Sequence, residues 1–317
     1  MHYDYRIASD RGSLFLALDA GGFERTVSVL PSLERPAVGD YVALDSDGRI
    51  EAIAPRRGVL ARVRSDRGNA AQIVAAHLDV VFIVTAPGRE FSPPRVERYL
   101  TAALAGGIAP VIVLNKCDIA DDLAALCGDL AAVAGDVPVH TISATTGEGC
   151  ATLLPYLREG ATLAVVGSSG VGKSTLANRL LGDDRFATGA TRASDGRGKH
   201  TTTSREMIAL PTGAWLIDTP GMRAFAPWAD EEALSEAFAD IAAASRRCRF
   251  RDCAHDSEPG CAVNAEIDDR RVTRWRALQA ELAYLDRRDD RALLAAEKKR
   301  WKHISKAQRS RYREERE

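Results

Sequence analysis

The chain has 317 residues, of which 45% are hydrophobic and 27% charged, and its formal net charge is −1. That length accommodates two or three domains with hydrophobic cores, and a net charge so close to zero does not by itself predict a partner. No apolar run approaches the roughly 20 residues needed to span a bilayer. The first residues also lack a secretory pattern. We therefore expect a cytoplasmic protein that does not insert into a membrane.

Residues 1–70 consist of short, alternating apolar stretches, among them RTVSVL and DYVALDSDGRIEAIA. The pair Asp47-Gly48 between two such stretches is a strong signal for a tight hairpin. We predict an OB-like β-barrel of five strands, a fold that binds oligonucleotides in other proteins. The alternative is a plain β-subdomain without a ligand, and the charges of this part balance.

Residues 71–227 show a different pattern. Continuous apolar runs such as LDVVFIVTA, APVIVLNK, TLAVVG and GAWLID are typical of strands buried on both faces. Between them lie stretches of helical period, for example PPRVERYLTAALAGG, which has Pro at its start and Gly after its end, and ATLLPYLR. Strands that alternate with helices predict an α/β domain with a parallel sheet covered on both faces.

Residues 228–317 are predicted to form a third, mainly helical domain. The stretches ADEEALSEAFADIAAASRR and AEIDDRRVTRWRALQAELAYLDRR have helical period. From Arg287 to Glu317 there are twelve Lys and Arg against six Asp and Glu. This end is therefore locally cationic, which favours a polyanion such as RNA.

The segment GSSGVGKST carries a phosphate-binding pattern. It fits G-x-x-x-x-G-K-[ST] and stands between a predicted strand and a predicted helix, the context that this pattern requires. Its glycines let backbone N–H groups surround a phosphate, while Lys173 neutralises the β- and γ-phosphates and Ser174 ligates Mg²⁺. The predicted phosphate-binding residues are Gly167, Ser168, Ser169, Gly170, Val171, Gly172, Lys173, Ser174 and Thr175.

A guanine-binding pattern, NKCD, comes earlier in the chain, at the end of a predicted buried strand. The carboxylate of Asp118 can accept the N1–H and N2–H donors of guanine, which adenine lacks, so ATP would be rejected. Lys116 is expected to pack along the base, and Asn115 to tie this loop to the phosphate loop. Backbone N–H groups near Ser143 and Ala144, in ISATTGEG, would meet the guanine 6-oxo group.

Two further segments complete a predicted GTP site. Asp218 in LIDTPG lies at the end of a predicted strand, where a carboxylate can hold Mg²⁺ through water, and the N–H of Gly221 would sense the γ-phosphate. The Thr-rich stretch GRGKHTTTSRE is typical of a mobile switch, and Thr202 or its neighbour Thr201 is expected to complete the Mg²⁺ shell. An ordinary flexible loop is the alternative for this stretch.

The residue that would orient the attacking water is unusual. Position 222 is Met, where a Ras-like GTPase uses Gln, and a thioether cannot orient water in that way. His200 is the best local replacement, so we predict it as a catalytic residue together with Lys173. The alternative is that His200 only hydrogen-bonds a loop or a phosphate. Slow intrinsic turnover, raised by a partner, is the expected consequence.

The order of these segments differs from that of most nucleotide-binding proteins, in which the phosphate loop comes first. Here NKCD and its companion loop precede the phosphate loop, the switch and DTPG. We interpret this order as a circular permutation of a GTPase domain, which preserves the sheet because the termini of compact domains often lie close together. Whatever follows DTPG is thereby attached to a segment that moves with the nucleotide state.

The stretch CRFRDCAHDSEPGC gathers four metal ligands with the spacing C-x4-C-x-H-x5-C. Four protein ligands suit a closed, tetrahedral structural zinc site, and such crowding in one loop argues for metal binding in a reducing compartment rather than for disulfides. The alternative is four unrelated residues. The expected ligands of one Zn²⁺ per chain are Cys248, Cys253, His255 and Cys261.

In this combination of motifs the chain resembles the RsgA (YjeQ/EngC) family of circularly permuted GTPases that depend on the small ribosomal subunit. The resemblance covers essentially the whole length, from the barrel through NKCD, GSSGVGKST, GKHTTT and DTPG to the zinc motif. It implies hydrolysis of GTP to GDP stimulated by the 30S subunit, a role in late subunit maturation, and contact with 16S rRNA through the barrel and the zinc domain. It also implies a catalytic role for His200, and we expect the protein to act as a monomer. The charge-balanced barrel departs from the basic RNA-binding face expected of the family.

Two other functions remain open. A nucleotide-gated RNA-binding assembly chaperone with vestigial hydrolysis is motivated by Met222. An ATP-dependent, kinase-like P-loop enzyme is disfavoured by the guanine-binding residues Asn115, Lys116 and Asp118. Hydrolysis of GTP and of ATP, with and without 30S subunits, would separate the three.

Overall fold

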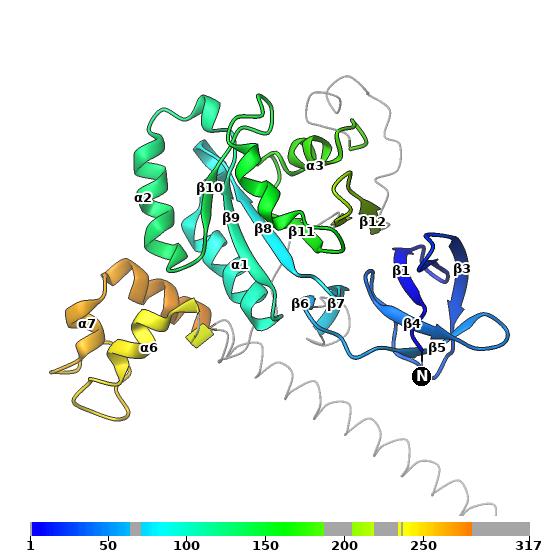
Figure 1. The fold of residues 1–317 in the computed structure, drawn as a ribbon. Coiled ribbons are helices and arrows are strands. Elements are labelled where there is room, and N and C mark those ends of the chain that lie inside the picture. Colours follow the sequence, from blue (N-terminus) through cyan, green and yellow to red (C-terminus); the bar gives the residue numbers. More distant parts are fainter. Residues whose placement is uncertain (1, 64–70, 187–204, 219–233, 236, 281–317) are drawn as a thin grey trace, which may run out of the picture.

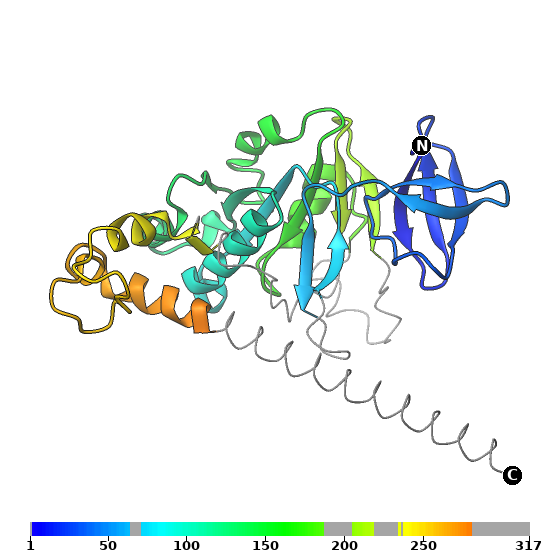
Figure 2. The same ribbon diagram turned by 90° about the horizontal axis from the view of Figure 1, so that it is seen from below.

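The computed structural model describes residues 2–63, 71–186, 205–218, 234–235 and 237–280 (Figure 1). Three parts follow one another along the chain: a β-barrel, an α/β domain and a helical C-terminal region. Two views at right angles place the barrel and the C-terminal region at opposite ends of the α/β domain (Figures 1 and 2). This architecture confirms the predicted fold class.

The N-terminal barrel is closed and has the strand order β1-β2-β3-β5-β4, with β1 also paired to β4. β3 and β5 are parallel, whereas the other neighbours are antiparallel. Alternate apolar side chains, including Ile7, Phe15 and Val42, fill the interior. Gly48, with φ +77°, turns the chain between β4 and β5, as the hairpin pattern predicted. The strands are β1 (Tyr5–Asp10), β2 (Phe15–Asp19), β3 (Glu24–Val29), β4 (Tyr41–Leu44) and β5 (Arg49–Ile53).

A two-stranded sheet follows the barrel. Its strands β6 (Leu60–Val63) and β7 (Ala71–Ala75) are antiparallel to each other, so the predicted division at residue 70 falls between paired strands. Leu60 and Ala75 pack in the core of the α/β domain. The division into residues 1–70, 71–227 and 228–317 stays a prediction at the level of single residues.

In the described part of the α/β domain, five parallel strands and one antiparallel strand form the sheet, in the order β10-β9-β8-β11-β13-β12. All six residues of β8 are buried, as predicted for a strand covered on both faces. The antiparallel strand β12 has no counterpart in the sequence prediction. The strands are β8 (Val80–Thr85), β9 (Ala109–Leu114), β10 (Val139–Thr141), β11 (Thr162–Val166), β12 (Glu206–Ala209) and β13 (Trp215–Asp218).

Helices cover both faces of this sheet. α1 and α2 pack on one face, and α3 packs with the 3-10 helix η3 on the other (Figure 1). The stretch at 151–158, predicted as helical, forms this 3-10 helix, which contains Pro155, a residue that cannot donate an N–H. Among the described helices, none has the length and apolarity that crossing a bilayer requires. Their bounds are α1 (Pro93–Ala105), α2 (Leu123–Ala134), η3 (Cys150–Tyr156) and α3 (Lys173–Leu181).

The barrel is joined to the edge of the α/β sheet. β1 pairs antiparallel with β12 at Ser9 and Glu206, so the strands of both parts belong to one sheet of 11 strands. The guanidinium of Arg6, in β1, donates to the carbonyl oxygen of Gly39 at 3.2 Å and to Oγ1 of Thr162 at 2.6 Å. Because Thr162 begins β11, the strand that leads to the phosphate loop is hydrogen-bonded to the barrel.

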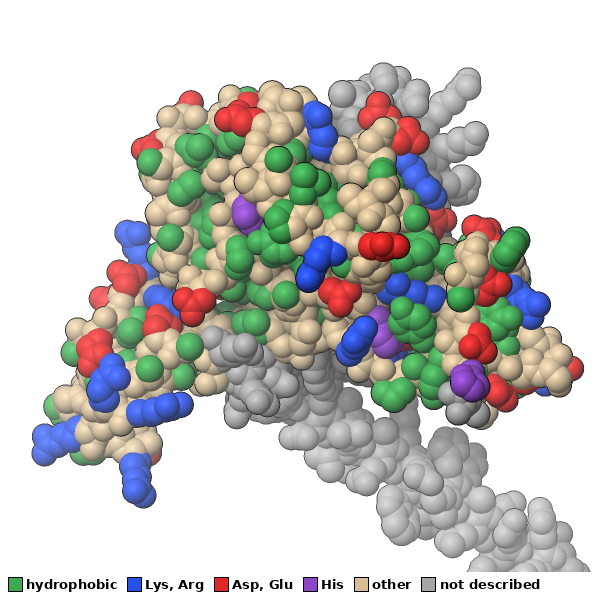
Figure 3. All heavy atoms as spheres, in the orientation of Figure 1, with side chains coloured by type: hydrophobic (Ala, Val, Ile, Leu, Met, Phe, Trp, Pro, Cys, Tyr) green, Lys and Arg blue, Asp and Glu red, His purple; other side chains and the backbone are tan. Residues whose placement is uncertain are grey.

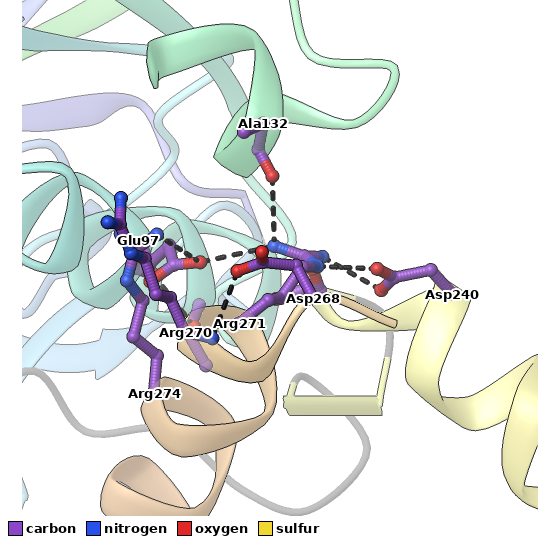
Figure 4. Close-up of polar contacts among 9 residues, drawn as sticks. Glu97, Ala132, Asp240, Asp268, Arg270, Arg271 and Arg274 are labelled. Carbon is purple, nitrogen blue, oxygen red and sulfur yellow. Dashed lines mark hydrogen bonds and ion pairs between the residues drawn. The ribbon is translucent and has the colours of Figure 1, made fainter. Parts of the chain in front are cut away.

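The C-terminal region contains α6 (Ala239–Ser245), α7 (Ala262–Glu266) and helical residues 269–280. It has a small core of its own, which includes Phe238 and Val263. Arg271 connects this region to the α/β domain. Figure 4 shows its side chain between Glu97 of α1, Ala132 of α2 and Asp240 of α6.

Candidate functional site

Three loops that carry the predicted nucleotide site leave the carboxyl ends of parallel strands. Residues 115–118 follow β9, residues 143–147 come after β10, and residues 167–172 lie between β11 and α3. The carboxyl ends of parallel strands meet at one edge of a sheet, which is where ligands of open α/β folds bind. Loops that are distant in the sequence therefore come together at this edge.

The phosphate loop requires glycine at two close contacts. Gly167 has φ +142°, and a Cβ atom there would lie 2.2 Å from the carbonyl oxygen of Val84. Gly172 has φ +92°, and a Cβ atom there would lie 2.3 Å from Nδ2 of Asn115. Neither position has room for a side chain, so the loop packs directly against β8 and against the NKCD segment.

Lys173 begins α3, and its side chain turns back over the phosphate loop. Its Nζ donates to the carbonyl oxygens of Gly167 at 2.8 Å and of Ser168 at 2.6 Å. Ser174 and Thr175 follow in the first turn of the helix and are half-buried. A helix N-terminus with an ammonium group beside it attracts anions, so a phosphate in this loop would meet both.

Asn115 connects all three loops. Its side chain is buried, with 1% of the residue exposed. Nδ2 donates to the carbonyl oxygen of Val171 at 2.8 Å, and Oδ1 accepts from the N–H of Ala144 at 2.9 Å. The predicted tie between the NKCD segment and the phosphate loop is therefore present, and the same amide also holds the loop after β10.

The residues after Asn115 present a carboxylate to solvent. Lys116 adopts a left-handed conformation with φ 63°, and its Cε would lie 3.8 Å from a Cβ atom at Gly172, so its stem runs along the phosphate loop. The N–H of Cys117 donates to the carbonyl oxygen of Ile142 at 3.0 Å and fixes the turn. Asp118 is exposed, and its carboxylate makes no hydrogen bond to any described residue, so both oxygens are available to a base.

The loop after β10 is held by a residue that the sequence patterns did not single out. Ser143 donates its N–H to the carbonyl oxygen of Glu148 at 2.9 Å, so this N–H, like that of Ala144, already has an acceptor within the protein. Arg179, in α3, donates from Nε to the carbonyl oxygen of Ala144 at 3.1 Å and from Nη2 to that of Thr145 at 2.6 Å. The only sequence signal for this contact is the position of Arg179 on the helix that follows the phosphate loop.

The remaining predicted residues of the nucleotide site are only partly described. Asp218 ends β13, beside β11, and is half-buried at the same edge of the sheet. The predicted Mg²⁺ ligands and catalytic residue of the switches lie outside the described residues, as do Gly221, Met222 and the cationic segment 287–317. The residues of the switches concerned are His200, Thr201 and Thr202.

The four predicted metal ligands lie together in the C-terminal region. The ligand atoms of Cys248, Cys253, His255 and Cys261 are all within 4.8 Å of one another. Nδ1 of His255 is 3.5 Å from Sγ of Cys248 and 3.6 Å from Sγ of Cys261, and these two sulfurs are 4.0 Å apart. In a tetrahedral zinc site, bond lengths of about 2.3 Å to sulfur and about 2.0 Å to nitrogen separate the ligand atoms by about 3.5–3.8 Å. The cluster therefore fits Zn²⁺.

Neighbouring groups orient these ligands. The N–H of Asn264 points at Sγ of Cys261 at 3.4 Å, and the ring of His255 lies 5.5 Å from that of Trp275. The carboxylate of Glu258 accepts from the N–H groups of Ala254 and Asp256, each at 2.8 Å, and so shapes the loop between the ligands. Burial lowers the pKa of His255, which favours the neutral imidazole that binds a metal. All six cysteines of the chain are free thiols, so none competes with this cluster through a disulfide.

Known proteins are similar in sequence to this chain over most of its length. The family model described as RsgA GTPase matches residues 53–228. The Small ribosomal subunit biogenesis GTPase RsgA of Opitutus terrae is 45% identical over 297 residues, which are 88% of this chain and 81% of that protein. The Small ribosomal subunit biogenesis GTPase RsgA 2 of Lactiplantibacillus plantarum is 48% identical over 258 residues, which are 78% of this chain and 72% of that protein.

Solved structures share the fold. YjeQ from Thermotoga maritima superposes with a TM-score of 0.64 and 26% identity, over 88% of this chain and 98% of the other. YloQ, described as a circularly permuted GTPase, gives a TM-score of 0.59 at 23% identity, over 88% of this chain and 94% of the other. At that identity the second match supports the fold alone, and it agrees with the order of loops found here.

Proposed function

The chain belongs to the RsgA GTPase family and is a GTP hydrolase, and on that premise we propose that the 30S ribosomal subunit stimulates its hydrolysis of GTP to GDP and phosphate. It would act in late maturation of that subunit, in the cytoplasm and as a monomer. The observation that carries the GTP assignment is the position of Asn115, whose one amide joins the guanine-binding segment, the phosphate loop and the loop after β10.

Each end of the nucleotide has its own set of residues in this proposal. Asp118 reads N1–H and N2–H of guanine, and the stem of Lys116 packs on the base. At the other end, the backbone of residues 167–175 surrounds the phosphates and Lys173 neutralises the β- and γ-phosphates. ATP would leave the Asp118 carboxylate without its two donors, which gives a physical basis for selecting GTP.

Magnesium fits the residues at the sheet edge. At this edge the hydroxyl of Ser174 and the carboxylate of Asp218 would hold the ion, since hard oxygen ligands suit it. A hydroxyl of Thr201 or Thr202, which lie outside the described residues, would complete its shell. The ion supplies charge neutralisation between the β- and γ-phosphates. Position 222 is Met and not the Gln of Ras-like GTPases, so His200 would orient the attacking water. The N–H of Gly221 would sense the γ-phosphate.

The C-terminal region would hold one structural Zn²⁺ and contact 16S rRNA. All four metal ligands come from the protein, so the site is closed and serves folding rather than chemistry. Exposed cations surround the metal loop, and Figure 3 shows Lys and Arg side chains gathered over this region at the lower left. Phe250, 42% exposed among them, offers a face for stacking on a base. The cations are Arg246, Arg249 and Arg251, together with Arg247, which is ion-paired with Glu266.

The barrel gives a second RNA contact in the proposal. Phe23, which precedes β3, is 76% exposed. Cations of the barrel are largely paired with acids, as in Arg35 with Asp10 and Arg49 with Asp45. We therefore assign the barrel a smaller electrostatic share of the binding than the C-terminal region.

Steady-state hydrolysis of GTP and of ATP by the full chain, with and without purified 30S subunits, tests this function. We expect turnover of GTP alone, raised by 30S but not by 50S subunits, and abolished in Lys173→Ala. His200→Ala should lose the stimulated rate, while His2→Ala, an exposed histidine that precedes β1 of the barrel, keeps it. Tight GTP binding without any stimulated turnover would contradict the proposal and favour a nucleotide-gated RNA-binding assembly chaperone.

A further inference from the structure

Arg179 links the two ends of the nucleotide site. It lies six residues after Lys173 on α3, about 9 Å along the helix axis. From there its guanidinium donates to two consecutive carbonyl oxygens of the loop after β10, those of Ala144 and Thr145. Because a guanidinium presents its donors in a rigid, planar fork, two bonds to one loop fix that loop relative to the helix. The helix that begins with the phosphate-binding lysine thus also sets the place of residues 143–147.

These bonds determine where one backbone N–H points. The carbonyl of Ala144 and the N–H of Thr145 belong to the same planar trans peptide, so they point in opposite directions. Since the carbonyl of Ala144 faces Arg179, the N–H of Thr145 faces away from α3. It donates no hydrogen bond to any described residue.

The other N–H groups of this loop have acceptors within the protein. Those of Ser143 and Ala144 donate to Glu148 and Asn115, as described above. Thr146 donates to Oγ of Ser143 at 3.1 Å, and Gly147 donates to the carbonyl oxygen of Ser143 at 2.8 Å. Within the loop 143–147, the N–H of Thr145 is therefore the donor left for a ligand.

Gly147 allows the loop to close over the guanidinium. Its φ is +91°, and a Cβ atom there would lie 3.1 Å from Nη1 of Arg179. The turn at Cys117, bonded to Ile142, brings Asp118 next to the start of the same loop. On a guanine whose N1–H and N2–H face Asp118, the 6-oxo group is the next atom along the same edge. The loop 143–147 is thus placed to meet it.

We propose that Arg179 is a positioning residue for recognition of the purine 6-oxo group, which it serves by holding the carbonyls of Ala144 and Thr145 against α3 so that the N–H of Thr145 faces the base. The inference rests on the proposed guanine site around Asp118. It assigns the donor to Thr145 rather than to Ser143 or Ala144, and it gives the exposed side chain of Arg179 a role in specificity.

The affinities for three nucleoside diphosphates distinguish a role of Arg179 in base specificity from a purely structural role in stabilising the loop. GDP has both the 6-oxo and the 2-amino group, IDP lacks the 2-amino group, and 6-thio-GDP replaces the 6-oxo oxygen by a weaker acceptor. The dissociation constants of all three would be measured by titration calorimetry for the unmodified protein, Arg179→Ala, Arg179→Lys, Asp118→Asn and the surface control Arg158→Ala.

In Arg179→Ala we expect GDP to bind about 3- to 10-fold more weakly, the range for one misplaced hydrogen bond. Its preference for GDP over 6-thio-GDP should fall towards one, while its preference for GDP over IDP is kept. Arg179→Lys retains a cation but not the planar fork, so its preference for GDP over 6-thio-GDP should lie between those of the unmodified protein and Arg179→Ala. Arg158→Ala should match the unmodified protein.

An equal loss for all three diphosphates in Arg179→Ala, or an unchanged preference over 6-thio-GDP in both Arg179 variants, would overturn the inference. Asp118→Asn should show the opposite pattern, with the preference over IDP lost. If Asp118→Asn leaves that preference intact, the proposed guanine site itself is wrong and the inference falls with it. The two failures therefore have different signatures.

Discussion

The guanidinium of Arg271 and the carboxylate of Glu97 are 3.1 Å apart, although 174 positions of the chain separate them. Glu97 lies on α1 with 3% of its side chain exposed, and Arg271 belongs to the C-terminal region. The same guanidinium also donates to both carboxylate oxygens of Asp240 and to the backbone carbonyl of Ala132 on α2 (Figure 4). One arginine thus joins two helices of the α/β domain to the C-terminal region, and its charge acts on the pKa values of two carboxylates.

Burial raises the pKa of Glu97 to about 7, against the opposing charges of Arg274 and Arg271. Partial burial raises the pKa of Asp240, but the hydrogen bonds and the charge of Arg271 outweigh this effect and lower the pKa overall. Of the two carboxylates that share Arg271, the buried one on α1 is therefore the group that titrates near neutral pH.

We predict that Glu97→Gln flattens the pH dependence of stability. In the unfolded chain a glutamate releases its proton near pH 4.3, so between about pH 4.5 and 7 the folded protein binds a proton that the unfolded chain does not. The contribution of this carboxyl to the free energy of unfolding therefore falls as the pH rises through that window. Melting temperatures from pH 5.5 to 8 should decline less in Glu97→Gln than in the unmodified protein. Equal slopes for both would contradict the prediction, and Glu51→Gln on the barrel surface is the control.

The metal cluster leads to a second prediction. The freshly purified protein should carry one zinc per chain, and Cys253→Ser or chelation should remove it and lower the melting temperature of the C-terminal region. The physical reason is that this region has only a small hydrophobic core and gains folding energy from a structural metal. Elemental analysis and calorimetry would measure both effects, with Cys127→Ser on α2 as the matched thiol control. Full zinc content in Cys253→Ser would refute the ligand assignment.

Much of this molecule could be predicted from local patterns. Asp47-Gly48 predicted a hairpin because glycine readily adopts the positive φ that Gly48 has in this turn. The phosphate loop was predicted because its spacing follows from the shape of a phosphate. The metal ligands were predicted because all four lie in one short segment. Contacts between distant side chains gave no such signal, and neither did the short strand β12. A single arginine in a helix does not reveal its partner, so the contacts of Arg271 and Arg179 appear only in three dimensions.

A third prediction concerns the close approach of Gly172 to Asn115. Gly172→Ala would place a Cβ atom 2.3 Å from Nδ2 of Asn115, so the amide that joins the three loops must move. We expect the free energy of unfolding to fall by about 2–4 kcal/mol, from overpacking and the left-handed backbone together. GDP should also bind at least about tenfold more weakly, since the loops that hold both ends of the nucleotide are displaced.

Gly160→Ala is the matched control for this substitution. Gly160 has φ +75°, but a Cβ atom there would have no atom within 4 Å. It should therefore show the backbone cost of about 1–2 kcal/mol without a loss of GDP affinity. Equal GDP affinities for the two variants would mean that the contact between Gly172 and Asn115 does not hold the site together.

The last prediction concerns the attachment of the barrel. Arg6 donates to Oγ1 of Thr162 at 2.6 Å, and the N–H of Thr162 donates to Oδ2 of Asp79 at 2.8 Å. Burial lowers the pKa of Arg6, which indicates that its charge is partly removed from water and depends on such acceptors. Thr162→Val keeps the shape of the side chain but removes the oxygen, so one donor of a half-buried guanidinium loses its acceptor. We expect the free energy of unfolding to fall by about 1–3 kcal/mol, with the effect concentrated at the contact between the barrel and the sheet.

Hydrogen exchange measures this effect. Exchange should accelerate in Thr162→Val at the pairing of β1 with β12, where Ser9 faces Glu206, and Thr162→Ser should restore the protection. If exchange there is unchanged in Thr162→Val while the whole protein melts lower, the hydroxyl stabilises β11 alone and the barrel is held by other contacts.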